Sequence, residues 1–357
     1  MTTNVLSFTK SLIAIESVKE KPHMLTKVLE TALEPLQGFT IERFEKNGVP
    51  SALVYVGSKR PKRFKILLNA HLDVVPAKPE QFIPYEKGDK LWGRGASDMK
   101  GAAAAEILSF KELANTASYP LGLQLVTDEE IGGFNATKYQ IQRGVRADFT
   151  IAGEPTDMDI NNQAKGVIWA KVNCMGKSAH GAYPWNGSNA LWKAHRFLSA
   201  LKLVYPVPTK EVWKTTVNVA RIETTNETFN KIPDNANIWL DIRYTPKDTD
   251  TVIDRLDAML PEGTKLEIIV QEPCQFTRKN NKYIAILSDA IQSVLKKKPD
   301  VIVKHGAADI RHFNAVGCDG VTWGPVGAGL HTNSEWVSIK SMVEYVQALQ
   351  IFLKTIS

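Results

Sequence analysis

The chain has 357 residues, a length typical of two folded domains. Apolar residues make up 43% of it and charged residues 23%, which excludes the polar composition of a disordered chain. The net charge is +6, but lysine and arginine are scattered, so the charge does not indicate a surface that binds nucleic acid.

The amino-terminal segment predicts a helix, because its apolar residues recur at helical spacing among polar ones. It lacks the basic start, the long apolar block and the cleavage site of a secretory signal. No apolar run is long enough to cross a bilayer. The three cysteines, Cys174, Cys274 and Cys318, lie far apart without metal-ligand spacing, which indicates free thiols in a reducing compartment. We therefore expect a cytoplasmic protein without a membrane partner.

Three apolar runs in the first half of the chain predict strands, and each run leads into acidic residues or histidine. They are FKILLNAHLDVV at 64–75, LGLQLVTDEE at 121–130 and DFTIAGEPTD at 148–157. Between the first two, the alanine-rich segment Met99 to Asn115 predicts a helix that begins just after Asp98. Strands that alternate with helices and end in reactive side chains predict an α/β sheet with a ligand site at its carboxyl edge.

The pattern changes after residue 165. Alternating apolar and polar residues predict strands, and two helical segments lie among them, which together indicate a small α+β unit of the split βαβ kind. A helix from Lys282 to Leu295, a strand near Val301 to Val303 and a closing helix near Met342 to Leu353 then resume the first unit. The sequence therefore predicts a domain at 1–166 and 277–357, with a second domain inserted at 167–276.

Seven carboxylate and histidine residues follow the apolar runs. Their clustering in one cleft would require a bound cation, because buried ionised groups are costly without an opposing charge. Imidazole and carboxylate suit a divalent ion, and Asp98 suits a bridging position, because the two glycines of GRGASDMKG permit a tight approach before the helix. Taken singly, each residue also has a plain alternative: a helix N-cap, a core histidine or a solvated loop. The seven are His71, Asp73, Asp98, Glu129, Glu130, Glu154 and His331.

Six short motifs follow one another along the chain: HLDVVP, GRGASDMKG, TDEEIGG, AGEPTD, GKSAHGAYP and LHTNSE. Together they resemble the M20 metallopeptidase family, which includes acetylornithine deacetylase, succinyl-diaminopimelate desuccinylase, aminoacylase and glutamate carboxypeptidase. The resemblance covers essentially the whole chain. It implies a zinc-exopeptidase-like α/β domain with helices on both faces of a mixed sheet. It also implies that the inserted α+β domain, ferredoxin-like in fold, is a lid and dimerisation domain.

The resemblance also implies a role for each residue. Two divalent ions, Zn²⁺ with Co²⁺ or Mn²⁺ as alternatives, would share Asp98 as the bridging ligand. His71 and Glu154 would complete one ion's ligands, and Glu130 and His331 the other's. Glu129 would be the general base, Asp73 would orient the ring of His71, and the peptide bond from Asp98 to Met99 would be cis.

Further residues match family positions for substrate binding. His180 and Asn230 would reach the active site of the partner in a homodimer, where His180 would stabilise the oxyanion. Arg243 would grip a substrate carboxylate through its planar fork, and Asp309 and Arg311 would line the cleft. Alternatives stay open: His180 as a loop histidine, Asn230 as a turn residue and Arg243 as a cation on the sheet surface.

The expected activity is hydrolysis of an amide bond in a small N-acyl amino acid or dipeptide by a metal-activated water, within amino-acid metabolism. The segment QAKGVIWAK and the order His180-Gly-Ala-Tyr-Pro-Trp185 depart from the desuccinylase pattern, which favours a deacylase similar to acetylornithine deacetylase. A desuccinylase and a glutamate-carboxypeptidase-like exopeptidase are the alternatives. A non-catalytic relative would have lost a ligand, yet the full set is present.

Overall fold

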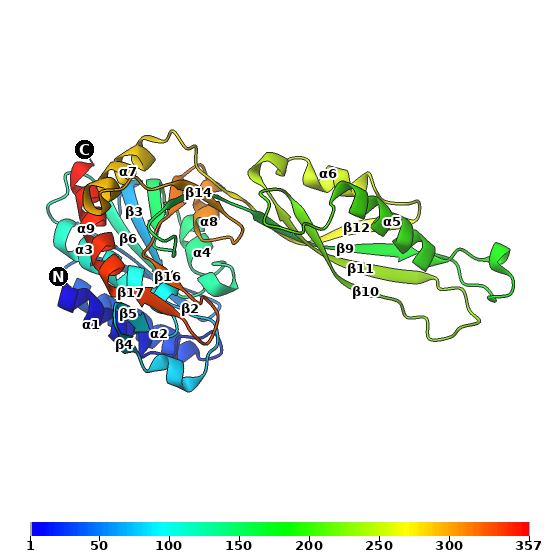
Figure 1. Ribbon diagram of the computed structural model, residues 1–357, viewed down its shortest axis with the longest axis horizontal. Helices are drawn as coiled ribbons and strands as arrows, with labels where there is room; N and C mark the ends of the chain where they lie inside the picture. Colours follow the sequence, from blue (N-terminus) through cyan, green and yellow to red (C-terminus); the bar gives the residue numbers. More distant parts are fainter. Residues whose placement is uncertain (1, 357) are drawn as a thin grey trace. The chain divides into compact units, whose positions relative to one another are not determined.

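The chain folds into two compact units, which Figure 1 draws from the computed structural model of the protein. The structure describes residues 2–356. The first unit contains the residues up to Gln163, then Phe276–Val303 and the residues from Ala308 onward. The second contains Ala164–Gln275 and Lys304–Ala307. The short segment Lys304–Ala307 carries no apolar pattern, so its place in the second unit was not predictable from the sequence.

A mixed sheet of nine strands forms the centre of the first unit, as far as the chain is described. Its order is β1-β2-β6-β3-β7-β15-β8-β13, and β14 pairs with β8. Strand β3 runs parallel to β6 on one side and to β7 on the other, and β15 runs parallel to β7. The strands are β1 (Thr40–Lys46), β2 (Val49–Tyr55), β3 (Phe64–His71), β6 (Leu121–Val126), β7 (Ala147–Ala152), β8 (Ile160–Ala164), β13 (Gln275–Phe276), β14 (Val301–Lys304) and β15 (Asp319–Thr322).

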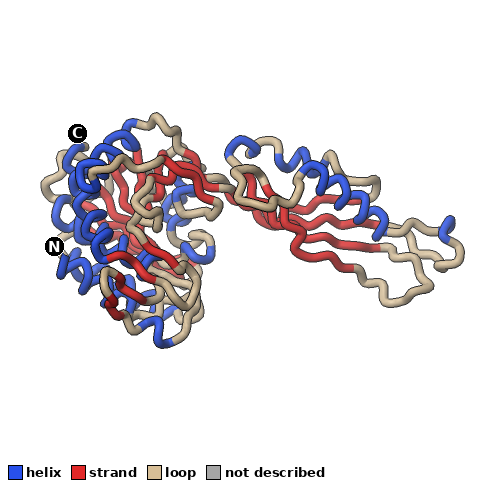
Figure 2. The backbone as a smooth tube through the Cα atoms, in the orientation of Figure 1, coloured by secondary structure: helices blue, strands red, loops and turns tan. Residues whose placement is uncertain are grey.

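Helices cover both faces of this sheet, as Figure 2 shows, because its central strands are apolar on both sides. Leu68 of β3 packs into the larger core with helices α1, α2, α3, α7 and α9, whereas the next residue back, Leu67, packs on the opposite face with α4 and α8. The predicted α/β architecture with a mixed sheet is confirmed. The helices are α1 (Thr2–Ile13), α2 (Pro22–Leu33), α3 (Gly101–Leu113), α4 (Thr137–Gln142), α7 (Lys282–Leu295), α8 (Ile310–Asn314) and α9 (Ile339–Thr355).

Helix α3 begins two residues later than the sequence predicts. A π-helical turn at Ala96–Lys100 precedes it, and within that turn Asp98 and Met99 have non-helical backbone angles. The peptide bond between these two residues is cis, as the resemblance implies. Regular α-helix therefore starts only at Gly101, after the backbone has placed Asp98 at the edge of the sheet.

Two antiparallel elements of the first unit escaped the sequence prediction. Strands β1 and β2 form a hairpin whose two-residue turn, Asn47-Gly48, has positive φ at both positions, and Asn-Gly is the usual sequence for such a turn. A second, small sheet has the order β16-β17-β5-β4 and joins segments that are far apart in sequence. Its strands are β4 (Tyr85–Lys87), β5 (Lys90–Trp92), β16 (Gly327–Ala328) and β17 (Trp336–Ser338).

The second unit is a four-stranded antiparallel sheet in the order β10-β11-β9-β12, with two helices packed on one face. Buried Phe197 and Leu201 of α5 contact the same core as Ile168 and Ile238 of the sheet. In chain order the elements run β-α-β-β-α-β, the split βαβ arrangement. They are β9 (Gly166–Met175), α5 (Ala190–Val204), β10 (Thr216–Glu223), β11 (Asn235–Tyr244), α6 (Val252–Asp257) and β12 (Thr264–Glu272).

Helix α6 is short, and a 3₁₀ turn at Pro246–Asp248 precedes it. Among residues 2–356, none of the helices has both the length and the apolar character required to cross a membrane.

Candidate metal centre and active site

The carboxyl ends of three parallel strands deliver most of the candidate ligands to one edge of the sheet. Strand β3 ends at His71, β6 leads into Glu129 and Glu130, and β7 leads into Glu154. Because β3 lies between β6 and β7 and is parallel to both, these side chains meet at the same edge. Asp98 reaches this edge from the turn before α3, and its carboxylate lies at the centre of the group.

Two groups of candidate ligands share the carboxylate of Asp98. One oxygen of Asp98 lies 3.0 Å from Nε2 of His71, and the other lies 3.4 Å from Nε2 of His331. Glu154 is 3.7 Å from the same nitrogen of His71, and Glu130 is 3.1 Å from that of His331. In each trio the ligand atoms all lie within 4.8 Å of one another. This donor set of nitrogen and oxygen atoms fits a pair of divalent cations with one bridging carboxylate.

The charges at this edge favour added positive charge. Burial would raise the pKa of Asp98, but hydrogen bonds with His331 and His71 outweigh it and lower that pKa. Hydrogen bonds with Asp98 and then Glu130 raise the pKa of His331 to about 10. Burial opposes the protonation of His71, yet the nearby carboxylates raise its pKa well above the usual value. The carboxylates thus attract protons to both imidazoles, and a divalent cation would displace those protons.

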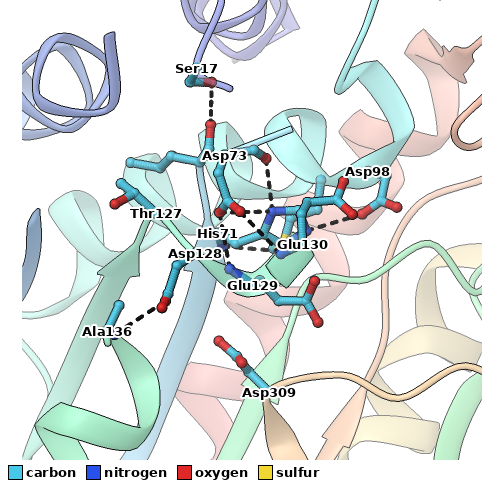
Figure 3. A network of polar contacts seen from close by, with 12 residues as sticks. Ser17, His71, Asp73, Asp98, Thr127, Asp128, Glu129, Glu130, Ala136 and Asp309 are labelled. Atoms are coloured by element: carbon cyan, nitrogen blue, oxygen red, sulfur yellow. Dashed lines mark hydrogen bonds and ion pairs between the residues drawn. The ribbon is translucent and has the colours of Figure 1, made fainter. Parts of the chain in front are cut away.

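Asp73 contacts both the ring of His71 and the turn that carries Glu129 and Glu130, and its role in orienting that ring stays a prediction. Its carboxylate accepts the backbone N–H groups of Glu129, at 3.2 Å, and of Glu130, at 3.0 Å, as Figure 3 shows. The ring nitrogen Nδ1 of His71 lies closer to the backbone oxygen of Asp73, at 3.1 Å, than to its carboxylate, at 3.6 Å. The Asp73 carboxylate therefore holds the turn that carries Glu129 and Glu130, and it also lies beside the imidazole of His71, whose pKa it raises.

Glu129 belongs to neither group of candidate ligands. Burial, and next the negative charge of Glu154, raise the pKa of Glu129 well above its usual value. A carboxyl group whose pKa is raised holds a proton more readily than an ordinary glutamate, which suits it to take up and release a proton. In Figure 3 the Glu129 side chain leaves the same short turn as Glu130, so the two adjacent carboxylates diverge from one backbone segment.

Asp309 and Arg311 lie beneath the turn that follows Glu130. Asp309 is fully buried and accepts a hydrogen bond from the hydroxyl group of Thr137. Arg311 is 5% exposed and donates to the backbone oxygen of Gly132 at 2.8 Å. The resemblance implies that both residues line the cleft. In the structure Arg311 contacts the turn through Gly132, and Asp309 contacts the first residue of α4. Direct contact with a substrate stays a prediction for both.

The remaining candidates lie in the second unit. The N–H group of Gly181 donates to the backbone oxygen of Asn230 at 2.7 Å, and His180 forms a bridge with Lys231, so the loops of His180 and Asn230 lie together. Arg243 lies near the opposite end of β11, where its guanidinium group pairs with Asp241 at 2.9 Å. The unit therefore brings His180 and Asn230 together but not Arg243, and the roles of all three stay predictions.

Sequence reasoning missed several buried ionisable residues around the candidate ligands. Lys100 donates to the backbone oxygens of Leu12 and Ile15, at 3.0 and 2.9 Å, and burial lowers its pKa to about 7. Glu106 accepts the hydroxyl group of Tyr345 at 2.9 Å, and burial raises its pKa. The only sequence signal was that Lys100 lies inside the motif around Asp98, since charged residues do not indicate burial by themselves.

Comparison with known proteins identifies the relatives of this chain. The family model described as peptidase family M20/M25/M40 matches residues 67–355. A succinyl-diaminopimelate desuccinylase of Beijerinckia indica is 28% identical over 95% of both chains. A protein named "Probable carboxypeptidase" from Emericella nidulans is 30% identical and covers 72% of this chain and 67% of its own. The crystal structure of a tripeptidase from Staphylococcus aureus has a TM-score of 0.79 at 19% identity, over 99% of this chain and 98% of that one, which shows a shared fold.

Proposed function

Because the chain belongs to peptidase family M20/M25/M40, we propose that it uses two divalent cations to hydrolyse the amide bond of a small N-acyl amino acid or dipeptide. Family membership makes it a hydrolase of amide or peptide bonds. The observation that carries the rest of the proposal is the carboxylate of Asp98, whose two oxygens face His71 at 3.0 Å and His331 at 3.4 Å. A single aspartate between two imidazoles is the geometry of a bridging ligand.

The proposed ligands divide into two trios that share this aspartate. When bound, the cations supply Lewis acidity that lowers the pKa of a bound water and polarises the substrate carbonyl. The donor set is compatible with Zn²⁺, and also with Co²⁺ or Mn²⁺. The trios are His71, Asp98 and Glu154 for one ion, and Asp98, Glu130 and His331 for the other.

Glu129 is the proposed carrier of protons. Its carboxylate would take a proton from the attacking water and then pass it to the departing amine, so that a carboxylic acid and an amine are the products. The raised pKa of Glu129 supports both directions of transfer. Asp73 supports this role because it holds the backbone of Glu129 and of the ligand Glu130 at the same time.

The second unit is proposed to contribute to substrate binding in a homodimer. His180 would stabilise the negative charge that develops on the carbonyl oxygen, with Asn230 beside it. The proposal of a homodimer is supported by β10, an edge strand of the described sheet whose residues 218–223 are exposed and can pair with another chain. Arg243 would need to leave Asp241 to bind a substrate carboxylate. A cytoplasmic location stays a prediction, which the three buried free cysteines support.

An N-succinyl group is the second candidate for the acyl group of the substrate. It is favoured by the relatives named succinyl-diaminopimelate desuccinylase, which match over nearly the whole chain at 28% identity. The segment QAKGVIWAK lacks the arginines expected of that branch, which favours an acyl group without a distal carboxylate. Both substrates share the amide bond and differ in the charge at the far end of the acyl group.

A hydrolysis screen tests the proposal. The purified protein is stripped with a chelator, reconstituted with Zn²⁺ or Co²⁺, and offered N-acetyl amino acids, N-succinyl-diaminopimelate and dipeptides. We expect turnover of at least one class only in the reconstituted protein, and its identity decides the acyl group. The variant Asp98→Asn serves as the matched control, since it keeps the size of the bridging side chain. Equal turnover in the stripped and reconstituted proteins would contradict the proposal.

A further inference from the structure

The carboxylate of Glu335 lies beneath the turn that presents Asp98. Its side chain is fully buried and accepts four hydrogen bonds from that segment. Arg94 donates to one oxygen at 2.5 Å, and the N–H group of Gly95 donates to the same oxygen at 3.0 Å. The N–H groups of Ser97 and Asp98 donate to the other oxygen, each at 3.0 Å. Three backbone N–H groups of this short segment, those of Gly95, Ser97 and Asp98, therefore surround one anion, the carboxylate of Glu335.

This arrangement fixes the backbone from which Asp98 projects. Gly95 has a φ of +80°, and the residues after it form the π-helical turn, so ordinary helical hydrogen bonds do not satisfy these N–H groups. Glu335 provides their acceptors instead. The N–H group of Asp98 itself is one of the four donors, so a shift of Glu335 would move the proposed bridging ligand directly.

Glu335 also belongs to the loop that carries His331. It lies four residues after His331, and residues 330–334 between β16 and β17 are exposed. The N–H group of Gly93 donates to the backbone oxygen of Glu335 at 3.1 Å, and Arg94 donates to the backbone oxygen of Thr332 at 2.9 Å. The pair Arg94 and Glu335 therefore ties the His331 loop to the Asp98 turn.

The two trios differ in how many of their ligands lie on segments that Arg94 and Glu335 hold together. In the trio of His71, Asp98 and Glu154, the imidazole is 1% exposed at the end of a central strand, and only Asp98 belongs to a segment that Glu335 holds. In the other trio, both Asp98 and His331 lie on such segments, and the side chain of His331 is 53% exposed. The second imidazole therefore lies on an exposed loop, whereas the first lies at the end of a buried strand.

We propose that Glu335 is a positioning residue that couples Asp98 to His331, so that the ion held by Asp98, Glu130 and His331 requires Glu335 more than the ion held by His71, Asp98 and Glu154. This inference rests on the proposed function, because it takes these residues as ligands. In this inference the ion pair of Glu335 with Arg94 positions two metal ligands, in addition to any contribution it makes to the stability of the fold. Partners of metal ligands commonly change metal affinity by about 10- to 100-fold when they are removed.

Stepwise metal titration tests this inference. The stripped wild type and the variants Glu335→Gln and Glu335→Ala are titrated with Co²⁺, followed by visible absorption and by calorimetry. We expect two binding steps in the wild type and a weaker second step in the variants, by about 10- to 100-fold in Glu335→Ala and by less in Glu335→Gln. The first step should change by a smaller factor. Glu335→Gln keeps the size of the side chain and one oxygen acceptor, so it provides a folded protein if the alanine variant unfolds.

Asp89→Ala is the matched control. Asp89 also ties two distant segments of the small sheet, because its carboxylate accepts the hydroxyl group of Ser338 at 2.6 Å and the N–H group of Lys340 at 2.9 Å. It holds neither the Asp98 turn nor the His331 loop. We expect wild-type metal binding in this variant even where its resistance to urea falls, which separates positioning from stability.

The outcomes are distinguishable. A wild type that binds fewer than two ions would remove the proposed function itself. A wild type with two steps and a folded Glu335→Gln variant with unchanged steps would overturn only the role of Glu335. Equal weakening of both steps in the Glu335 variants would refute the selective coupling, because the structure ties two ligands of one trio and one of the other to this carboxylate.

Discussion

Replacing Asp73 with asparagine should lower both the turnover and the affinity for the ion held by Asp98, Glu130 and His331. In the folded protein the two oxygens of Asp73 accept the N–H groups of Glu129 and Glu130, at 3.2 and 3.0 Å. Asparagine has a single side-chain oxygen, so one of the two N–H groups would face the NH₂ group and lose its acceptor. The substitution therefore affects the turn that carries the proposed base and a proposed ligand, while it hardly changes the volume of the side chain.

The size of the effect follows from these two contacts. A hydrogen bond to a charged group contributes about 1.5–3 kcal/mol, and one such bond is lost. A tenfold change in an equilibrium or a rate corresponds to about 1.36 kcal/mol, so we expect a decrease of about 10- to 150-fold. The decrease should appear in kcat, because Glu129 loses its position, and in the affinity for the ion that Glu130 holds.

The measurement combines steady-state hydrolysis with metal titration of the stripped protein. Ser17→Ala is the matched control, because the hydroxyl group of Ser17 donates to the backbone oxygen of Leu72 at 2.6 Å, at the same strand end, and does not contact the turn. We expect near-normal kcat and metal affinity in the control. If Asp73→Asn keeps both quantities within about twofold of the wild type, its two oxygens do not position the turn and the reasoning is wrong.

Three further predictions follow from other contacts. Glu129→Gln should lower kcat by about 10²- to 10⁴-fold while metal content stays normal, as measured by steady-state kinetics and metal analysis, and near-normal kcat would exclude Glu129 as the base. Gly153→Ala should lower the free energy of unfolding, measured in urea, by about 1–3 kcal/mol, because its Cβ would lie 2.6 Å from the Cβ of Ala102. In the control Gly38→Ala, the added Cβ would approach none of the described atoms within 4 Å, so the free energy of unfolding should change little. Burial and then Arg311 lower the pKa of His312 to about 3, so as the pH falls from about 6 to 4 the unfolded chain takes up a proton that the folded protein does not. The free energy of unfolding of the wild type should therefore fall by about 1.4 kcal/mol per pH unit relative to that of His312→Gln. Parallel curves of unfolding free energy against pH for the two proteins would contradict this.

The elements with strong local patterns were predictable from the sequence. The predicted helix from Lys282 to Leu295 has the observed bounds, because its apolar spacing is regular and Asn281 caps it. The end of β3 at His71 and the start of α3 at Gly101 differ from the predicted bounds, because the segments that carry candidate ligands set them and periodicity does not. The small sheet was missed because its strands are two or three residues long and pair across the sequence.

The candidate site was predictable in its residues but not in its supports. His71, Asp98 and His331 carry side chains whose chemistry and motifs indicate a metal, and the structure brings them together. The contacts of Asp73 and Glu335 with backbone N–H groups left no signal, because the sequence does not show which carboxylate a distant turn will face. Backbone hydrogen bonds of this kind appear only once the chain has folded.

The position of β15 has a consequence for the synthesis of the protein. Strand β7 pairs with β3 on one side and with β15 on the other, and the whole second unit is translated between β7 and β15. On the ribosome, the edge of β7 that pairs with β15 therefore stays unpaired while the second unit is synthesised. Such an uncovered, apolar edge can pair with another nascent chain. Slow translation of the inserted segment should thus favour aggregation, and a chaperone that covers this edge should raise the yield of folded protein.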